Sequence, residues 1–351
     1  MKKPIAFFAA LLAALVAAAP SAHAENSYLQ NIRLVGRFLV DGSRAAFEWP
    51  GSAIEINFDG SSLDLSLTDT GNNSMMVEVD GTVSRINLEK GRHDYHIVGT
   101  EKSGPHSVRL IRRTEAFLGA TVLEDVRVNG TILPPAQKPH SLLVIGDSIS
   151  TGYGVEGKDT KCGFSGDTEN QYLTYAAVAA RRFDADVISL AFSGKGLVQN
   201  YDGKTNATMA DIYGRLLPSR TSDAPLPKSD VIIVHLGSND YANGARPVGF
   251  VQRYLELLAA LRENAPDAQI YAAIGPMLAG DDLDVALKSI NEVVDKRHAE
   301  GDAKIATIQF TDPVGTPSRG CDWHPNEAGQ AFMAEQLTAQ IQRDLGWAQV
   351  E

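Results

Sequence analysis

The sequence predicts two consecutive domains, a jelly-roll-like β-sandwich followed by an α/β domain built on a parallel sheet. Alternation with period two, punctuated by Asp-Gly and Asn-Gly pairs, runs through the first third of the chain. A proline-rich break follows, and beyond it apolar runs alternate with helical periodicity. We therefore expect a signal peptide over 1–24, the β-sandwich domain over 25–133, a linker over 134–139 and the α/β domain over 140–351.

The first residues have the order of a secretory signal. Lys2 and Lys3 precede an apolar run from Ile5 to Ala19, and small residues lead to a cleavage site after Ala24. The run is too short to span a bilayer comfortably, and no later segment approaches the roughly 20 apolar residues that a span needs. We expect a mature protein that is periplasmic or secreted and does not bind a membrane.

The charge of the chain excludes one class of partner. The formal net charge is −11, and removal of Lys2 and Lys3 with the signal makes it −13. An acidic surface repels phosphate backbones, so nucleic acid is not expected as a partner. We expect a monomer that uses neither a metal nor another cofactor.

The β-domain is predicted from alternating apolar residues and from turns. Asp59-Gly60, Asp80-Gly81 and Asn129-Gly130 are typical of tight turns between antiparallel strands. Many short strands of this kind favour a sandwich over an open sheet. The alternating residues are Ile54, Ile56, Phe58, Leu63, Leu65, Leu67, Val77, Val79, Tyr95, Ile97, Val108, Leu110, Val126 and Val128.

The α/β domain is predicted from five apolar runs that read as buried strands. One amphipathic stretch between them has apolar residues spaced as on a helix face, from Phe250 to Leu261. Strands alternating with helices form a parallel sheet covered on both faces, and such sheets bind ligands beyond the carboxyl ends of their strands. The five runs are Leu142–Ile145, Val187–Leu190, Val231–Leu236, Ile270–Ile274 and Ile305–Phe310.

Residues capable of acyl-transfer chemistry follow these runs. Ser148 follows the first run as the candidate nucleophile, and His324 is the natural general base. Asp322 precedes the base by two residues and could orient its ring, although it could instead cap the helix that follows. The backbone N–H groups of Ser148 and Gly194 and the side chain of Asn239 are candidate oxyanion donors.

Other polar residues near the strand ends are expected to be structural. His235 falls inside an apolar run and is interpreted as a satisfied core residue. Asp147 and Asp240 are interpreted as turn residues whose carboxylates bond nearby backbone N–H groups.

Three aromatic residues and two cysteines complete the candidate site. Trp323, Tyr153 and Tyr241 could stack on a sugar ring or wall an acyl pocket, and the alternative is ordinary loop packing. Cys162 and Cys321 are the only cysteines. In an oxidising compartment we expect them to form a disulfide, the alternative being two buried thiols.

These motifs resemble a known superfamily over about residues 140–351. The blocks Gly146-Asp147-Ser148, Gly194, Gly237-x-Asn239-Asp240 and Asp322-x-His324-Pro325 are similar, in order, to those of the SGNH (GDSL-like) hydrolases. The resemblance implies an SGNH-type α/β fold with Ser148 as nucleophile, Asp322 and His324 completing the triad, and Gly194 and Asn239 in the oxyanion hole.

A narrower resemblance is to carbohydrate esterase family two, the acetylxylan-esterase-like enzymes. It rests on the preceding β-domain and on Gly152-Tyr153-Gly154, Thr168-Glu169-Asn170, Ser193-Gly194-Lys195-Gly196 and Gly320-Cys321-Asp322-Trp323-His324. It implies metal-free removal of acetyl groups from polysaccharides such as xylan or glucomannan. Some members rely on a Ser-His pair, so the need for Asp322 stays open.

The sequence thus predicts an exported serine esterase that acts on an acetylated carbohydrate through an acyl-serine intermediate. One alternative keeps the fold but makes it a lipid esterase or thioesterase, which would need a broad apolar groove. The other alternative is an inactive glycan-binding protein whose β-domain is a lectin. The intact set of Ser148, His324, Asp322, Gly194 and Asn239 argues against that loss of activity.

Overall fold

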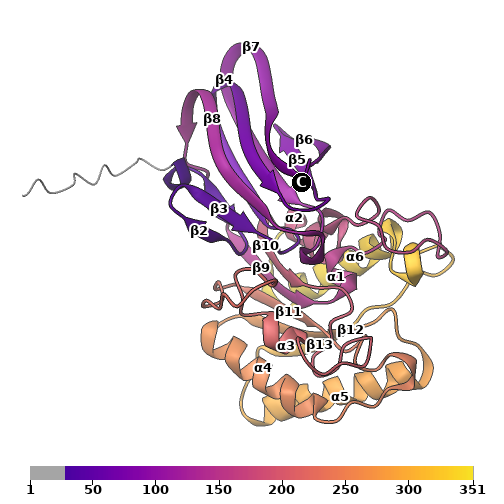
Figure 1. Ribbon diagram of the computed structural model, residues 1–351. Coiled ribbons are helices and arrows are strands. Elements are labelled where there is room, and N and C mark those ends of the chain that lie inside the picture. The colour runs from indigo at the N-terminus through magenta and orange to yellow at the C-terminus, as the bar shows by residue number, and fades with distance from the viewer. Residues whose placement is uncertain (1–27, 351) are drawn as a thin grey trace, which may run out of the picture.

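The computed structural model describes residues 28–350. An antiparallel β-domain precedes an α/β domain with a parallel sheet, and in Figure 1 the indigo and purple strands of the first lie above the helices of the second. The signal peptide predicted over 1–24 lies outside the described residues.

The β-domain is one eight-stranded antiparallel sheet in the order β2-β3-β8-β4-β7-β5-β6, with β1 paired to β4. The predicted turn at Asp80-Gly81 is confirmed, because both residues have positive φ, 50° and 83°, between β5 and β6. The strands are β1 (Arg33–Val35), β2 (Leu39–Asp41), β3 (Arg44–Phe47), β4 (Ala53–Asp69), β5 (Ser74–Val79), β6 (Thr82–Asn87), β7 (Gly91–Arg112) and β8 (Thr121–Leu133).

The turn expected at Asp59-Gly60 is wrong, since both residues lie inside β4. Gly60 pairs with Gly104 on one side and Gly130 on the other, and the ladders shift register just after it. A Cβ at Gly60 would lie 2.3 Å from the carbonyl oxygen of Asn129. Gly60 and Gly130 therefore allow close approach of β4 and β8 at a bulge. Strands β4 and β7 reach 17 and 22 residues, longer than the short strands expected.

All five predicted parallel strands are confirmed. They are β9 (His140–Gly146), β10 (Ala185–Ala191), β11 (Val231–His235), β12 (Gln269–Ile274) and β13 (Ile305–Gln309), in the order β10-β9-β11-β12-β13. Alternate residues of β9 serve opposite faces: Leu143 and Ile145 belong to one core cluster, and Leu142 and Val144 to the other. Burial on both faces explains why these strands read as continuous apolar runs.

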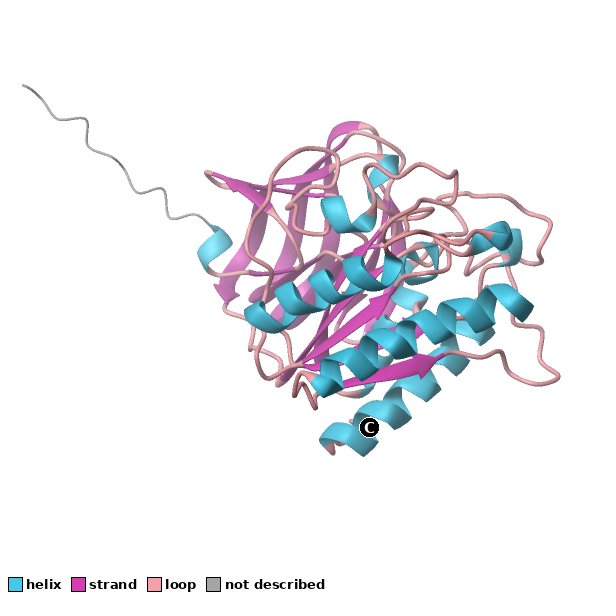
Figure 2. Ribbon diagram, turned by 90° about the horizontal axis from the view of Figure 1, so that it is seen from below, coloured by secondary structure: helices cyan, strands magenta, loops and turns pink. Residues whose placement is uncertain are grey.

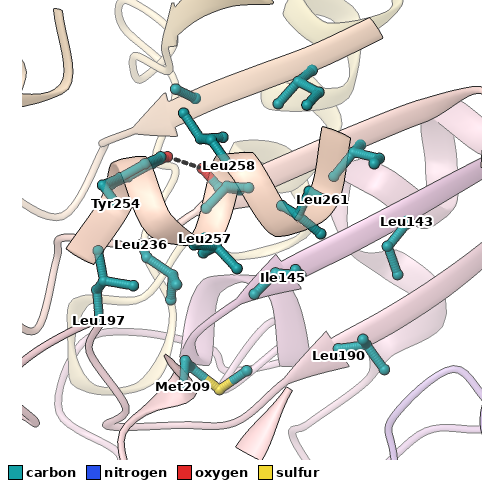
Figure 3. Packing of buried hydrophobic residues seen from close by; sticks show 14 of the residues in the cluster. Leu143, Ile145, Leu190, Leu197, Met209, Leu236, Tyr254, Leu257, Leu258 and Leu261 are labelled. Atoms are coloured by element: carbon teal, nitrogen blue, oxygen red, sulfur yellow. Dashed lines mark hydrogen bonds between the residues drawn. The ribbon is translucent and has the colours of Figure 1, made fainter. Parts of the chain in front are cut away.

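Helices cover the two faces of this sheet, as the view from below shows (Figure 2). The predicted helix is α4, and its Leu257 and Leu261 lie next to Ile145 of β9 (Figure 3). The helices are α1 (Ser148–Thr151), α2 (Tyr175–Arg182), α3 (Met209–Ile212), α4 (Phe250–Asn264), α5 (Gly280–Ala299) and α6 (Glu327–Leu345), with short 3₁₀ turns η1 (Tyr28–Gln30), η2 (Ala116–Leu118), η3 (Gln171–Leu173), η4 (Ala242–Gly244) and η5 (Cys321–Trp323). Within residues 28–350, no helix combines the length and apolar character that crossing a membrane requires.

The two domains are joined by buried polar contacts as well as by residues 134–139. Arg33 of β1 pairs with both Glu55 and Asp186, the latter on β10. The guanidinium of Arg37, 3% exposed, donates to four main-chain carbonyls between Gly214 and Pro225. These bonds form only when the domains are in contact, so they favour the observed arrangement of the two domains.

Candidate active site

Ser148 lies at the carboxyl edge of the parallel sheet, as the first residue of α1 directly after β9. Asp147 is the N-cap of this turn, and its Oδ1 accepts the Ile149 N–H at 3.0 Å. The cap holds the chain where it leaves the strand. The Ser148 side chain consequently reaches a pocket at the sheet edge.

His324 is hydrogen-bonded on both ring nitrogens. Its Nε2 lies 2.8 Å from Ser148 Oγ, and its Nδ1 lies 3.2 Å from the carbonyl oxygen of Cys321. A carbonyl only accepts, so Nδ1 carries the proton, and Nε2 is left to accept the hydroxyl proton of Ser148. The two residues are thus arranged as nucleophile and general base.

Burial keeps this base neutral. It lowers the pKa of His324 to about 4, against the opposing effect of the backbone at Cys321 and Asp322 and of the Asp322 charge. A neutral imidazole is the form that accepts a proton, so His324 is competent as a base at neutral pH.

Asp322 differs from the expected Ser-His-Asp arrangement. Its Oδ2 accepts a hydrogen bond from the Tyr153 hydroxyl, while Nδ1 of His324 is bonded to the Cys321 carbonyl. The reason is local backbone geometry, because Asp322 and Trp323 both have positive φ, 48° and 64°. Asp322 therefore acts on the base through its charge and through Tyr153.

The aromatic ring of Tyr153 packs against the ring of His324. Its ring stacks on that of His324 with centroids 4.0 Å apart and an interplanar angle of 23°. The Asp322 carboxylate fixes the hydroxyl end of the same ring. Tyr153 thus restricts the rotation of the imidazole and lines the pocket.

The expected oxyanion donors line this pocket with Ser148. Gly194 is in a turn closed by the Lys195 N–H and the Phe192 carbonyl at 3.3 Å, and its φ of 75° suits the third position of a type II turn. Asn239 Nδ2 donates to the Lys195 carbonyl at 2.9 Å and lies 3.3 Å from Asp147 Oδ2. Asn239 therefore connects the Gly194 turn to the nucleophile's N-cap.

The structural interpretation of Asp147, Asp240 and His235 is confirmed. The Asp240 carboxylate accepts three consecutive backbone N–H groups, from Leu197 to Gln199. His235 is fully buried between the Tyr175 hydroxyl and the Gly275 carbonyl.

The pocket has a volume of about 660 Å³ and two exposed aromatic rings at its rim. Trp323, 66% exposed, is one of the predicted contacts. The second exposed ring belongs to Tyr201, which is 62% exposed. Sequence reasoning missed Tyr201 because it does not directly follow a strand. Its backbone N–H donates to the Gly194 carbonyl at 2.9 Å, so Tyr201 is held beside the Gly194 turn.

Tyr241 is not a pocket residue, which corrects the sequence interpretation. It is 3% exposed, belongs to the core cluster and packs edge-on against Phe250. Its hydroxyl is 2.8 Å from Ser289 Oγ.

Cys162 and Cys321 form a disulfide that closes a sequence separation of 159 residues. The Asp322 N–H also donates to the Cys162 carbonyl at 2.9 Å. Because the Cys321 carbonyl orients His324, these bonds hold the base loop beside the nucleophile.

Two family models match the chain. The GDSL-like lipase/acylhydrolase family matches residues 144–332, and the N-terminal domain of carbohydrate esterase 2 matches residues 34–136. The matches cover the α/β domain and the β-domain respectively, so both folds agree with the family.

Named relatives are esterases. "Cellulase/esterase CelE" of Acetivibrio thermocellus is 34% identical over 89% of this chain, which spans 39% of that relative's length. An "acetylxylan esterase / glucomannan deacetylase" of Cellvibrio japonicus is 27% identical over 90% of each chain.

A solved family two carbohydrate esterase from Clostridium thermocellum, in complex with cellohexaose, is 33% identical with a TM-score of 0.86. The alignment covers 90% of this chain and 99% of that one. The two family matches and the likeness to this esterase agree. The chain belongs to the GDSL-like lipase/acylhydrolase family and, within it, to the family two carbohydrate esterases.

Proposed function

We propose that this protein is an exported acetyl esterase that deacetylates a polysaccharide through an acyl-Ser148 intermediate. The observation that carries the proposal is the 2.8 Å contact between Ser148 Oγ and His324 Nε2, in a pocket rimmed by two exposed aromatic rings. The relatives named as acetylxylan esterase and glucomannan deacetylase support an acetylated carbohydrate as the substrate.

The first step acylates the serine. His324 Nε2 takes the hydroxyl proton while Ser148 Oγ attacks the acetyl carbonyl carbon. The resulting oxyanion accepts hydrogen bonds from the backbone N–H groups of Ser148 and Gly194, and from an Asn239 N–H that exchanges its 3.3 Å bond to Asp147 Oδ2 for one to the oxyanion. The imidazolium then gives its proton to the departing sugar oxygen as the ester bond breaks. Acetyl-Ser148 and a free hydroxyl on the sugar remain.

The second step repeats the proton transfers with water. His324 accepts a proton from water, which attacks acetyl-Ser148, and the imidazolium returns a proton to Ser148 Oγ as acetate leaves. The bond from Nδ1 to the Cys321 carbonyl holds the ring in one tautomer through both steps.

The walls of the pocket suit a small acyl group on a sugar. Trp323 and Tyr201 offer flat faces on which a pyranose ring can stack. Met277 and Leu278 line the same pocket and provide apolar surface for a methyl group.

Export is supported by two features. The order of charged, apolar and small residues over 1–24 is that of a secretory signal. The disulfide between Cys162 and Cys321 is of a kind that persists in oxidising compartments. We therefore propose that the mature protein works in the periplasm or outside the cell.

A set of ester substrates tests the function. We expect hydrolysis of acetylated xylan or glucomannan, and higher kcat/KM on 4-nitrophenyl acetate than on the butyrate or octanoate, because longer chains must displace the walls. A fluorophosphonate should label wild type once and Ser148→Ala not at all. Best activity on octanoate would favour the lipid-esterase alternative, and turnover by Ser148→Ala would refute the serine mechanism.

A second measurement tests the sugar contact. Trp323→Ala should lower kcat/KM on an acetylated oligosaccharide by about tenfold, a stacking loss of roughly 1.4 kcal/mol, and should change 4-nitrophenyl acetate hydrolysis much less. Equal losses on both substrates would remove the stacking role of Trp323.

A further inference from the structure

One carboxylate of the β-domain reaches the edge of the active site. The segment joining β7 to β8 faces the α/β domain (Figure 1), and Glu115 within it is fully buried. Glu115 Oε2 accepts the backbone N–H of Ser193 at 2.7 Å, and Oε1 accepts the Ser193 hydroxyl. A single side chain from the other domain thus binds both donors of the residue that precedes Gly194.

The bonded residue controls an oxyanion donor. The peptide N–H of Gly194 belongs to the unit that joins it to Ser193, so the orientation of this donor depends on how Ser193 is held. Asn239 restrains the other side of the same turn at the Lys195 carbonyl. Glu115 and Asn239 therefore hold the turn at its two ends.

Glu169 is the more readily protonated of two neighbouring buried carboxyls, Glu115 and Glu169. Glu169 is also fully buried, and its Oε2 accepts the Glu115 N–H at 3.1 Å. Burial and the nearby charge of Glu115 raise the pKa of Glu169. Burial also raises the pKa of Glu115, but hydrogen bonds from Glu169 and Ser193 and the charge of Arg112 oppose this. Of the two carboxyls, Glu115 therefore ionises more readily, and the bonds that it accepts from Ser193 are stronger when it is ionised.

We infer that Glu115 is a positioning residue of the oxyanion hole: from the β-domain it holds Ser193 so that the Gly194 N–H faces the developing oxyanion. The inference rests on the proposed function. Glu115 acts through Ser193 and has no contact with substrate. The β-domain is, on this basis, part of the catalytic unit.

The chain contains a matched control for this role. Glu48, 2% exposed, also belongs to the β-domain, and its Oε2 accepts the Ser219 N–H at 2.9 Å while its Oε1 accepts the Ser219 hydroxyl at 2.5 Å. Ser219 lies between α3 and β11 and does not line the active-site pocket. The same interdomain bonds therefore occur once beside the Gly194 turn and once away from it.

The test compares Glu115→Gln with Glu48→Gln in the full mature chain on 4-nitrophenyl acetate. Glutamine keeps the shape but loses the charge and one acceptor. Glu115→Gln should lower kcat by about tenfold or more with KM changed less than about twofold, because misplacing a donor weakens transition-state binding only. The Kd for phenylboronic acid, which forms a tetrahedral adduct on serine, should rise by a similar factor. Glu48→Gln should keep kcat and boronate affinity within about twofold of wild type, even if its Tm falls as far as that of Glu115→Gln.

Ser193→Ala and Ser219→Ala provide a second pair in case Glu115→Gln does not fold. Ser193→Ala removes only the hydroxyl bond and should lower kcat by about threefold with weaker boronate binding, whereas Ser219→Ala should not. Wild-type kcat in either Glu115→Gln or Ser193→Ala, or equal kcat losses at the two Glu–Ser pairs, would overturn the positioning role. A wild-type protein without ester hydrolysis would instead reject the proposed function.

Discussion

Two buried histidines of this protein have similar hydrogen-bond partners, a hydroxyl and a main-chain carbonyl, but we propose different roles for them. His324 lies between the Ser148 hydroxyl and the Cys321 carbonyl, and His235 lies between the Tyr175 hydroxyl and a main-chain carbonyl. Burial lowers the pKa of both rings to about 4. Partners and pKa alone therefore do not distinguish a catalytic base from a core residue.

The difference lies in what surrounds each hydroxyl. The Tyr175 hydroxyl is enclosed in the core, with His235 and Phe310 packed against the ring. Ser148 and His324 both line the pocket, so a carbonyl carbon can reach the serine oxygen while its proton passes to the ring. In the proposed mechanism, it is the access of substrate to the Ser148 hydroxyl that makes the same hydrogen-bonding pattern catalytic.

Replacing each histidine gives the sharpest contrast. We expect His324→Ala to lower kcat by about 10³-fold or more, because the serine proton then has no acceptor. His235→Ala should keep most activity but lose about 2 kcal/mol or more of stability, since it leaves a cavity and an unpaired carbonyl in the core. Steady-state kinetics and thermal melts of the two variants check this, and a nearly active His324→Ala would identify another base.

Removal of the disulfide should affect His324 and not His235, because the disulfide holds the loop that contains His324. Closing a separation of 159 residues contributes at most about 5 kcal/mol in the chain-entropy model. Cys162→Ser together with Cys321→Ser should therefore lower both Tm and kcat, through the freed Cys321 carbonyl. Thiol titration of denatured wild type from an oxidising compartment is the control, and two free thiols would show that the bridge does not form.

The pH dependence tests whether His324 shares the low pKa of the core histidine. A base with a pKa of about 4 stays neutral as pH falls from 7 to 5, and kcat/KM should fall only near pH 4. At pH 5 the neutral fraction would be roughly thirtyfold higher than for an unperturbed histidine. A fall centred near 6.5 would contradict the burial argument.

The smallest effect should come from the Asp322–Tyr153 bond, which has no counterpart at His235. Asp322→Ala and Tyr153→Phe remove the same hydrogen bond and should each lower kcat by roughly threefold to tenfold. Kinetics of the single and double variants check whether the two losses overlap. If Asp322→Ala were as damaging as His324→Ala, the carboxylate would be acting on the ring directly.

Much of the fold and the central pair of the site could be predicted from local pattern. Continuous apolar runs indicated all five parallel strands, because strands buried on both faces have no polar alternation. Ser148 and His324 could be chosen because the carboxyl ends of parallel strands meet at one edge of the sheet. Both inferences depend only on residue order, which the sequence contains.

The remaining features depended on contacts between segments far apart in the chain. Asp59-Gly60 reads as a turn until Gly104 and Gly130 are placed beside it on neighbouring strands. Asp322 lies two residues from the base, yet positive φ values direct its carboxylate to Tyr153 and leave the ring to a carbonyl.

Glu115 shows the same limit between the two domains. It lies 78 residues before Ser193 and in the other domain, and no spacing in the sequence pairs them. The sequence by itself identified the residues that we propose for the chemistry. The tertiary structure decided which groups orient them, because a hydrogen bond selects its partner by distance and direction in space and not by separation along the chain.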